Sequence, residues 1–191
     1  AVRSYPGGAD LMGYDVRRRP FSKVRVIEGK TYTMEPRFDN ADREIERIFP
    51  DGRNLTFTFD GASRVIGIDG VVQEVTYTPQ NQVASVVRSN GLTDVYTYDQ
   101  RLRPVGLNVG SLQNISVEYD RASNVLSFND AANSALMPST QFGYDAWYRS
   151  VDVQRGERNI AMSFDLIDNM QSKNDETYTY EGRPGAATTL G

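Results

Sequence analysis

The sequence predicts an all-β protein, an antiparallel β-meander of repeated hairpins whose wide sheet curls or spirals. Three observations predict this fold class. An aromatic residue followed by Asp recurs at intervals of about 21 residues along most of the chain. Glycine-containing turn signals fall roughly midway between these pairs. Tyr, Phe, Val and Thr are plentiful while stretches rich in helix formers are few, which favours strands and turns.

The aromatic–Asp pair marks each repeat. Random placement of the chain's Tyr and Phe residues would give only about 1.6 such pairs, so the recurrence indicates a repeat architecture. The pairs are Tyr14-Asp15, Phe38-Asp39, Phe59-Asp60, Tyr98-Asp99, Tyr119-Asp120, Tyr144-Asp145 and Phe164-Asp165, and two degenerate copies, Tyr77-Thr78 and Tyr180-Glu181, fill the gaps.

Each part of the repeat has a mechanical interpretation. Apolar residues two positions before the aromatic, such as Phe57 and Tyr96, give the period of two that places one strand face against a core. The Asp side chain can accept a hydrogen bond from the backbone N–H two residues on and so start a turn. The chain then resumes an extended path at a polar residue five positions after the aromatic: Arg19, Arg43, Arg64, Gln82, Arg103, Asn124, Arg149 or Asn169.

A second set of turns is expected on the other side of each strand pair. Asn-Gly and Asp-Gly are strong hairpin signals because these residues tolerate positive φ. Strands such as 64–68 and 71–77 fit between the two sets, so each repeat should form two strands and two turns. The signals are Glu28-Gly29-Lys30, Pro50-Asp51-Gly52, Asp69-Gly70, Asn90-Gly91, Gly110-Ser111 and Arg155-Gly156-Glu157.

Two stretches depart from this pattern. Residues 42–49 have the apolar spacing of two helical turns, but their place in the repeat predicts a strand. Residues 130–140 replace a tight turn with a longer loop that contains Pro138. Because no Pro/Gly/Ser-rich linker divides the chain, residues 1–191 are expected to form one domain of about nine repeats.

Composition narrows the range of functions. The net charge of −4 argues against nucleic acid as a partner, because phosphate binding normally needs a basic surplus. No apolar run is long enough to insert into a membrane. The chain has no Cys or His, which excludes thiolate and imidazole chemistry and His- or Cys-ligated metals. We therefore expect no cofactor and no metal site.

The repeat resembles the YD repeat of the RHS family, whose motif reads Tyr-x-Tyr-Asp-x-x-Gly-Arg-Leu. The segment YTYDQRLRPV (96–105) is most similar to it, followed by FTFDGASRVI (57–66) and VEYDRASNVL (117–126). The resemblance covers residues 12 to 183. It implies a strip of antiparallel strands that forms part of a hollow shell, as in bacterial RHS toxins, insecticidal toxin complexes and teneurins.

The resemblance also implies a function, a non-catalytic scaffold that encapsulates or presents a toxin or effector domain. Its partners would be further YD repeats or a cargo domain of the same or a companion chain, and its location extracellular or on the bacterial cell surface. Full shells contain several times as many repeats, so we expect this chain to be either a fragment of one or an open partial turn, with sheet edges prone to self-association. The family's self-cleaving C-terminal segment has no counterpart here.

Two alternative functions remain from the residues themselves. Trp147 and Tyr148 fall within a turn rather than at a core position, and form a candidate ligand platform on which a glycan could stack. The carboxylates of Asp39, Asp42 and Glu44, or of Asp165 and Asp168, could in principle support a glycosidase or bind calcium. Neither cluster has the spacing of a calcium loop, and nothing selects a catalytic pair, so we predict that the chain is not an enzyme.

Overall fold

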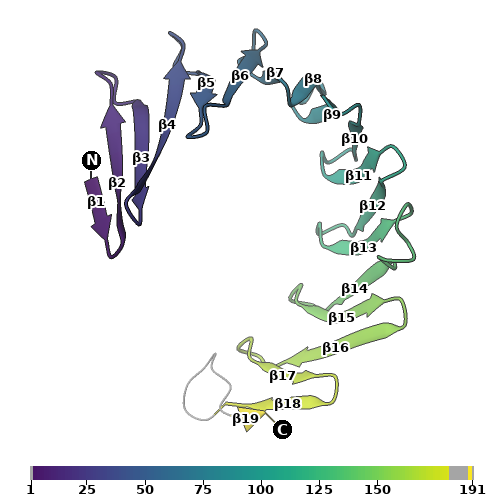
Figure 1. The fold of residues 1–191 in the computed structure, drawn as a ribbon. Coiled ribbons are helices and arrows are strands. Elements are labelled where there is room, and N and C mark those ends of the chain that lie inside the picture. The colour runs from purple at the N-terminus through teal and green to yellow at the C-terminus, as the bar shows by residue number, and fades with distance from the viewer. Residues whose placement is uncertain (1, 181–188, 191) are drawn as a thin grey trace. The chain divides into compact units, whose positions relative to one another are not determined.

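In the computed structural model of the chain, which describes residues 2–180 and 189–190, the described residues form β-strands joined by turns and no helix (Figure 1). Every strand pairing within them is antiparallel, so the predicted all-β meander is confirmed. The chain divides into two compact units, residues 1–93 and residues 94–191. The expectation of one domain over 1–191 stays a prediction. No helix of the described residues is long and apolar enough to cross a membrane.

The first unit is a run of hairpins. Its strands are β1 (Val2–Tyr5), β2 (Gly8–Tyr14), β3 (Pro20–Ile27), β4 (Lys30–Phe38), β5 (Glu44–Ile48), β6 (Asn54–Phe59), β7 (Val65–Ile68), β8 (Val72–Tyr77) and β9 (Val83–Arg88). The 42–49 segment therefore contains a strand, β5, and no helix, as its place in the repeat predicts.

The second unit repeats the same arrangement. Its strands are β10 (Thr93–Tyr98), which starts at the boundary between the units, β11 (Pro104–Val109), β12 (Gln113–Tyr119), β13 (Val125–Asp130), β14 (Thr140–Tyr144), β15 (Ser150–Arg155), β16 (Arg158–Phe164), β17 (Met170–Lys173), β18 (Glu176–Thr179) and β19 (Thr189–Leu190). The predicted long loop joins β13 to β14, since β13 ends at Asp130 and β14 begins at Thr140.

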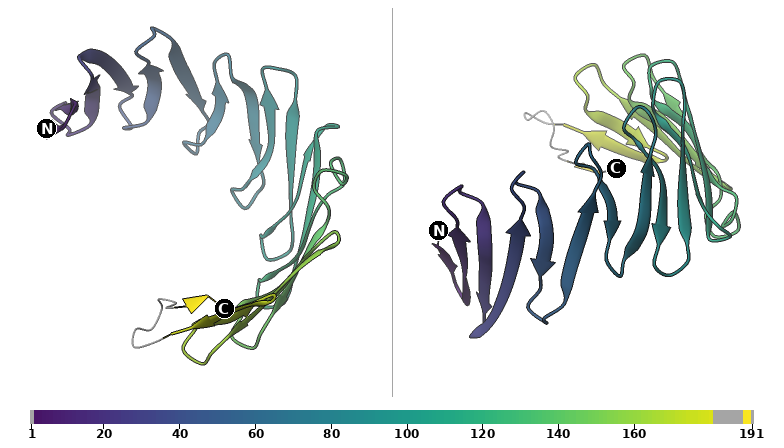
Figure 2. Two further views of the ribbon diagram at one scale, coloured as in Figure 1. Left: turned by 60° about the horizontal axis from the view of Figure 1, so that its bottom comes forward. Right: turned by 90° about the horizontal axis from the view of Figure 1, so that it is seen from above.

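Within each unit, strands contact only their neighbours in sequence among the described residues (Figure 2). For example, β12 lies between β11 and β13, with Ile115 opposite both Leu107 and Asp130. A chain built in this way is close to one-dimensional: its stability is the sum of local hairpin terms and nearest-neighbour terms. Every repeat must therefore be held to the next by contacts of its own.

The two predicted sets of turns alternate along the chain. In the midway set, glycine occupies the left-handed region of φ, as the hairpin signals predict; at Gly91, for instance, φ is 86°. The same holds for Gly29, Gly52, Gly70, Gly110 and Gly156.

At the aromatic–Asp turns the strand register shifts in a constant way. The aromatic residue pairs with the residue six positions after it. The residue just before the aromatic pairs with the residue eight positions after the aromatic, so one residue of the second strand is skipped. Tyr98 thus faces Pro104 and Thr97 faces Gly106, which leaves Val105 as an extra residue in β11. Such a bulge bends the strand and increases its local twist. Because it recurs after each described motif from Tyr14 to Phe164, the bend is built into the repeat.

The third residue after each Asp adopts a left-handed backbone although it is not glycine. In the motif of the resembling family this position is Gly. Here, within the described repeats, φ lies between 61° and 76° at Arg18, Asp42, Ser63, Asn81, Leu102, Ser123, Tyr148 and Asp168. A side chain in this region costs about 1–2 kcal/mol, so these turns are held in place by the interactions around them.

Replacing one of these residues with glycine should stabilise the protein. Arg18 suits the test because it is exposed and φ there is 62°. After allowing for the greater flexibility of glycine in the unfolded chain, Arg18→Gly should raise the free energy of unfolding by about 0.5–1 kcal/mol. Urea unfolding measures the change. Arg18→Ala removes the same side chain but keeps the strain, so a gain of equal size in Arg18→Ala would contradict this explanation.

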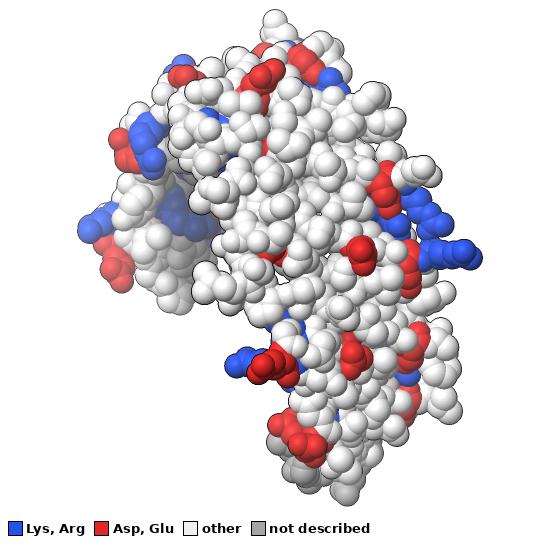
Figure 3. All heavy atoms as spheres, turned by 90° about the vertical axis from the view of Figure 1, so that its right-hand side faces the viewer, with Lys and Arg blue, Asp and Glu red and all other residues white. Residues whose placement is uncertain are grey.

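Burial follows the predicted alternation, but more weakly than expected. In β6 the side chains of Leu55, Phe57 and Phe59 are half-buried while the residues between them are exposed. The face expected to pack against a core is half-buried: among the described residues Val109, 8% exposed, is the one buried hydrophobic residue. The reason is that, in the described part of each unit, strands contact only their sequence neighbours and no second layer of structure covers the sheet. In the view of Figure 3, uncharged side chains cover most of the visible surface, and Lys, Arg, Asp and Glu are scattered among them.

Candidate functional site

The predicted motif residues form a ring of hydrogen bonds around each turn, which we call the Asp clasp. In the repeat at Asp99, one carboxylate oxygen accepts the backbone N–H groups of Arg101 (2.8 Å) and Arg103 (3.0 Å). The other oxygen accepts the Arg103 Nε–H at 2.7 Å. The Asp99 N–H donates to the Arg103 carbonyl and the Leu102 N–H to the Asp99 carbonyl, which closes the hairpin. The hydrogen bond from the N–H group two residues after the Asp is the one that the sequence predicted.

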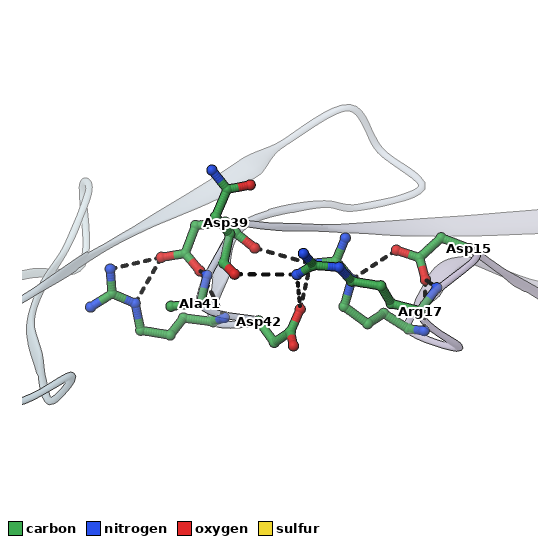
Figure 4. Close-up of polar contacts among 8 residues, drawn as sticks. Asp15, Arg17, Asp39, Ala41 and Asp42 are labelled. Atoms are coloured by element: carbon green, nitrogen blue, oxygen red, sulfur yellow. Dashed lines mark hydrogen bonds and ion pairs between the residues drawn. The ribbon is translucent and has the colours of Figure 1, made fainter.

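The same clasp recurs in the other motifs. Figure 4 shows two successive turns of the first unit, with Asp15 facing the backbone of Arg17 and Asp39 facing that of Ala41. The Asp–Arg clasps are Asp15–Arg19, Asp39–Arg43, Asp60–Arg64, Asp99–Arg103 and Asp145–Arg149, and the Asp–Asn clasps are Asp120–Asn124 and Asp165–Asn169. In the degenerate repeat, the Thr78 hydroxyl accepts the Gln82 N–H at 3.2 Å. Glu181 of the other degenerate copy lies outside the described residues.

The clasp holds its aspartate in the charged form. The pKa of Asp60 is lowered by hydrogen bonds from the Arg64 backbone and side chain, against a smaller opposing effect of burial. The pKa of Asp99 is lowered likewise, first by the Arg103 backbone N–H. In the Asp120 turn the largest cause is the hydrogen bond from the Asn124 amide. These carboxylates are therefore anions at neutral pH, and a general acid would have to be protonated there.

The arginine of each clasp also reaches the next repeat. The Arg103 guanidinium lies over the Tyr119 ring, 4.5 Å from its centroid, and donates to the Asp120 carbonyl at 2.9 Å. A guanidinium this close to a ring gains a cation–π attraction. Arg149 repeats both contacts with Phe164 and the Asp165 carbonyl. The remaining pairs are Arg19 over Phe38, Arg43 over Phe59 and Arg64 over Tyr77.

The motif tyrosines add a second link between repeats. The Tyr77 hydroxyl donates to the Val65 carbonyl at 2.6 Å, and the Tyr144 hydroxyl to the Val125 carbonyl at 2.8 Å. Tyr119 and Tyr180 make the equivalent bonds to Pro104 and Met170. Tyr14 differs, since its hydroxyl contacts the Met12 sulfur. Burial raises the pKa of Tyr98. Together with the arginine–ring contacts, which also involve Phe38, Phe59 and Phe164, these bonds explain why the motif carries an aromatic residue at this position and not merely an apolar one.

The two carboxylate clusters noted in the sequence are engaged by arginine or by backbone. Asp39 is held by Arg43, and Asp42 by Arg17 (3.1 Å) and Arg19 (2.8 Å). Glu44 pairs with Arg47 at 2.6 Å. In the other cluster, Asp165 is bound in its clasp and Asp168 pairs with Arg149 at 2.8 Å. In the described part of the chain no group of Asp and Glu residues is arranged to hold a metal ion.

The candidate ligand platform is exposed. Trp147 is 64% and Tyr148 63% exposed, in the turn that follows Asp145. In the neighbouring turn Leu166 and Ile167 are 87% and 67% exposed. Arg149 joins the two turns, because its guanidinium lies 5.1 Å from the Trp147 ring centroid and bonds to the second turn. We call these four exposed side chains the apolar edge.

Sequence reasoning missed the most buried polar group. Asp130 is only 1% exposed, and its carboxylate accepts the N–H groups of Asn114 (2.9 Å) and Ala132 (3.2 Å) and the Asn133 side-chain amide (2.8 Å). The Asn114 bond is the first cause of its lowered pKa. Asn133 in turn donates to the Leu112 carbonyl at 2.7 Å. Asp130 thus anchors the 131–139 loop; the signal in the sequence was the departure of this loop from the repeat.

Comparison with known proteins gives a match in structure alone. No family model and no curated protein sequence matches the chain. A crystal structure of TcdB2-TccC3 without its hypervariable C-terminal region aligns with a TM-score of 0.78 and 16% identity, over 96% of this chain and 12% of that one. The TcdB2-TccC3-Cdc42 crystal structure gives 0.76 and 16%, over 95% and 12%. A Photorhabdus luminescens Tc holotoxin pore structure, which carries TccC3-D651A, gives 0.71 and 15%, over 90% and 11%.

The matched chains are therefore about eight times longer than this one, and at such identity the likeness establishes the fold. The strand pairings, the recurring bulge and the Asp clasps give the same architecture from this chain's own residues. The chain therefore has the β-sheet fold of the aligned segment of the TcdB2-TccC3 structures, formed by the YD-like repeats of its own sequence.

Proposed function

We propose that this chain is a non-catalytic scaffold, a segment of a β-shell that encloses or presents a toxin or effector domain. The observation that carries the proposal is the double role of the clasp arginine, which closes its own turn and holds the next repeat. A sheet joined in this way can be extended by adding repeats without any second layer. The likeness in fold between this chain and segments of the much longer toxin-complex chains supports the same function.

The partners in this proposal are further repeats or a cargo domain, in the same chain or a companion chain. The outer side of β1 has no paired strand among the described residues, and all four of its residues are exposed. An open strand edge of this kind favours pairing with another strand, including self-association. Resemblance to Tc toxin components supports an extracellular or cell-surface location.

Absence of catalysis is part of the proposal. The motif aspartates are bound to backbone N–H groups and to arginine or asparagine, and their pKa values are lowered. A glycosidase needs one carboxyl group with a raised pKa to act as the acid. The clasps provide the opposite environment.

Electron cryomicroscopy of the protein that carries this sequence, purified from its native source, tests the proposal. We expect a hollow particle walled by these repeats, with additional density inside or a domain presented at its opening. Protease treatment should then spare the enclosed domain until the shell is unfolded. An open sheet with every other domain outside it and equally sensitive to protease would overturn the encapsulating function.

A second candidate function is glycan or cell-surface binding at the apolar edge. It is favoured by the exposure of Trp147 and Tyr148, whose ring faces can stack on a sugar ring. Trp147 is the chain's single tryptophan, so its fluorescence reports on this edge directly.

If this edge binds a glycan, Trp147→Ala should weaken binding at least tenfold, because the stacking surface is lost. A glycan array identifies the ligand, and calorimetry of wild type and variant measures the affinity. Trp147→Phe should retain part of the affinity, and Leu136→Ala, at an exposed apolar residue in the 131–139 loop, should retain all of it. An array without hits, or equal loss in Leu136→Ala, counts against this function.

A further inference from the structure

The 131–139 loop forms a pocket on one face of the second unit. The pocket has a volume of about 440 Å³ and is lined by Phe128, Met137, Pro138, Thr140, Phe142, Val153, Arg155, Arg158 and Ile160. This size lies within the range of small-molecule sites. It lies where the loop replaces the tight turn found between the other described repeats.

The lining residues form two rows across the sheet. Phe142, Val153 and Ile160 stand directly opposite one another on β14, β15 and β16. The second row runs from Phe128 through Thr140 to Arg155 and Arg158. Since neighbouring strands lie about 4.8 Å apart, this row is about 14 Å long. The pocket is therefore an elongated apolar trough with one cationic end.

The loop that borders this trough is fixed in place. The buried Asp130 carboxylate holds its start, and the Asn133 carbonyl accepts the N–H groups of Leu136 (2.9 Å) and Met137 (2.7 Å). Pro138 lies against Gly156, where an added Cβ would come within 3.2 Å of the proline ring. The trough thus exists before any ligand enters, which lowers the entropic cost of binding.

The positive charges of Arg155 and Arg158 are not neutralised by an acidic partner among the described residues. Arg155 and Arg158 face each other as a cross-strand pair, and like charges in this position destabilise a hairpin. Neither forms an ion pair with any described residue, although Glu157 stands in the turn between them and lines an adjoining hollow. The clasp arginines, by contrast, are each paired with an aspartate or lie against a ring. An anion bound between Arg155 and Arg158 would remove the repulsion.

We propose that this trough binds a medium-chain aliphatic carboxylate. The carboxylate would bind between Arg155 and Arg158, which offer planar donors suited to it. The alkyl chain would run along Phe142, Val153 and Ile160 toward Phe128, bordered by Met137 and Pro138. A small molecule fits better than a macromolecule, because the apolar lining of the trough is confined to the part of the sheet that this one loop borders.

Calorimetric titration of the full chain with decanoate, below its micelle concentration, tests the proposal. We expect saturation at one equivalent and an affinity at least tenfold higher than for decyltrimethylammonium. The double variant Arg155→Gln/Arg158→Gln should lose at least tenfold in affinity for decanoate while its affinity for decanol stays within twofold. The charge-matched double variant Arg101→Gln/Arg121→Gln, at exposed arginines of the clasp turns, should bind decanoate as wild type does.

Thermal unfolding of each variant confirms that it is folded before titration. Equal affinity for the anionic and cationic amphiphiles would overturn the proposal, as would equal loss in both double variants or uptake that never saturates. A leucine-rich peptide with a free C-terminal carboxylate that binds more tightly than decanoate would overturn the small-molecule assignment.

Discussion

Asp99→Ala is expected to lower the melting temperature by about 5–10 °C, the largest effect of any single substitution predicted for this chain. The substitution removes the acceptor for two backbone N–H groups and for the Arg103 side chain. It leaves Arg103 without its anion, so the guanidinium is also less well fixed over Tyr119. Loss of a charged acceptor is costly because all its donors lose their partner together. Thermal unfolding followed by far-ultraviolet circular dichroism measures the effect.

Two further variants separate the causes. Asp99→Asn keeps a side-chain oxygen for the backbone N–H groups but loses the ion pair, and should cost about half as much. Asp175→Ala removes a carboxylate that is exposed and outside any clasp, and should shift the melting temperature by less than about 2 °C. A similar loss in Asp99→Ala and Asp175→Ala would mean that the clasp does not stabilise the fold.

Acidification is the second large effect, because it acts on every clasp at once. The folded-state pKa values of Asp15, Asp39, Asp60, Asp99, Asp120, Asp145 and Asp165 all lie below the ordinary value of 3.8. The unfolded chain therefore binds protons more readily than the folded chain in this range. By linkage, the stability contributed by the clasps is complete above the unfolded-state pKa and is lost as pH falls through the lower, folded-state values.

We expect a melting temperature that is nearly constant from pH 7 to 5 and falls steeply below pH 4. The chain has no histidine, so no side chain with an ordinary pKa between 5 and 8 obscures the plateau. Replacing both Asp60 and Asp99 with Asn should lower stability at pH 7 and flatten the decline in acid. An unchanged melting temperature down to pH 2, or a decline that begins above pH 6, would contradict the lowered pKa values.

Much of the fold could be predicted from the sequence because each repeat contains the residues that determine its own strands and turns. The residue types around Asp60, Asp99 and Asp120 determine a strand, a turn and a second strand by short-range physics. The midway glycines were likewise predictable, since Gly91 and Gly110 supply a backbone conformation that other residues avoid. The helical spacing of residues 42–49 did not mislead, because the repeat assigned that segment to a strand.

The links between repeats could not be read from the sequence in the same way. Arg103 was identified as a recurring position, but its contact with Tyr119, sixteen residues later, depends on the strand register and on the bulge at Val105. The degree of burial was overestimated, because alternation along a strand does not show whether a second layer covers the sheet. Asp130 ends β13 just before the loop that departs from the repeat, so the repeat pattern itself did not mark its carboxylate as buried.

A double-mutant cycle between Arg103 and Tyr119 tests most directly whether the clasp arginine joins one repeat to the next. The free energies of unfolding of Arg103→Met, Tyr119→Leu and the double variant are measured in urea. A guanidinium 4.5 Å from a ring that is partly shielded from water should give a coupling of about 0.5–1 kcal/mol. Strict additivity of the two substitutions would contradict the account, because the repeats would then be joined by strand pairing alone.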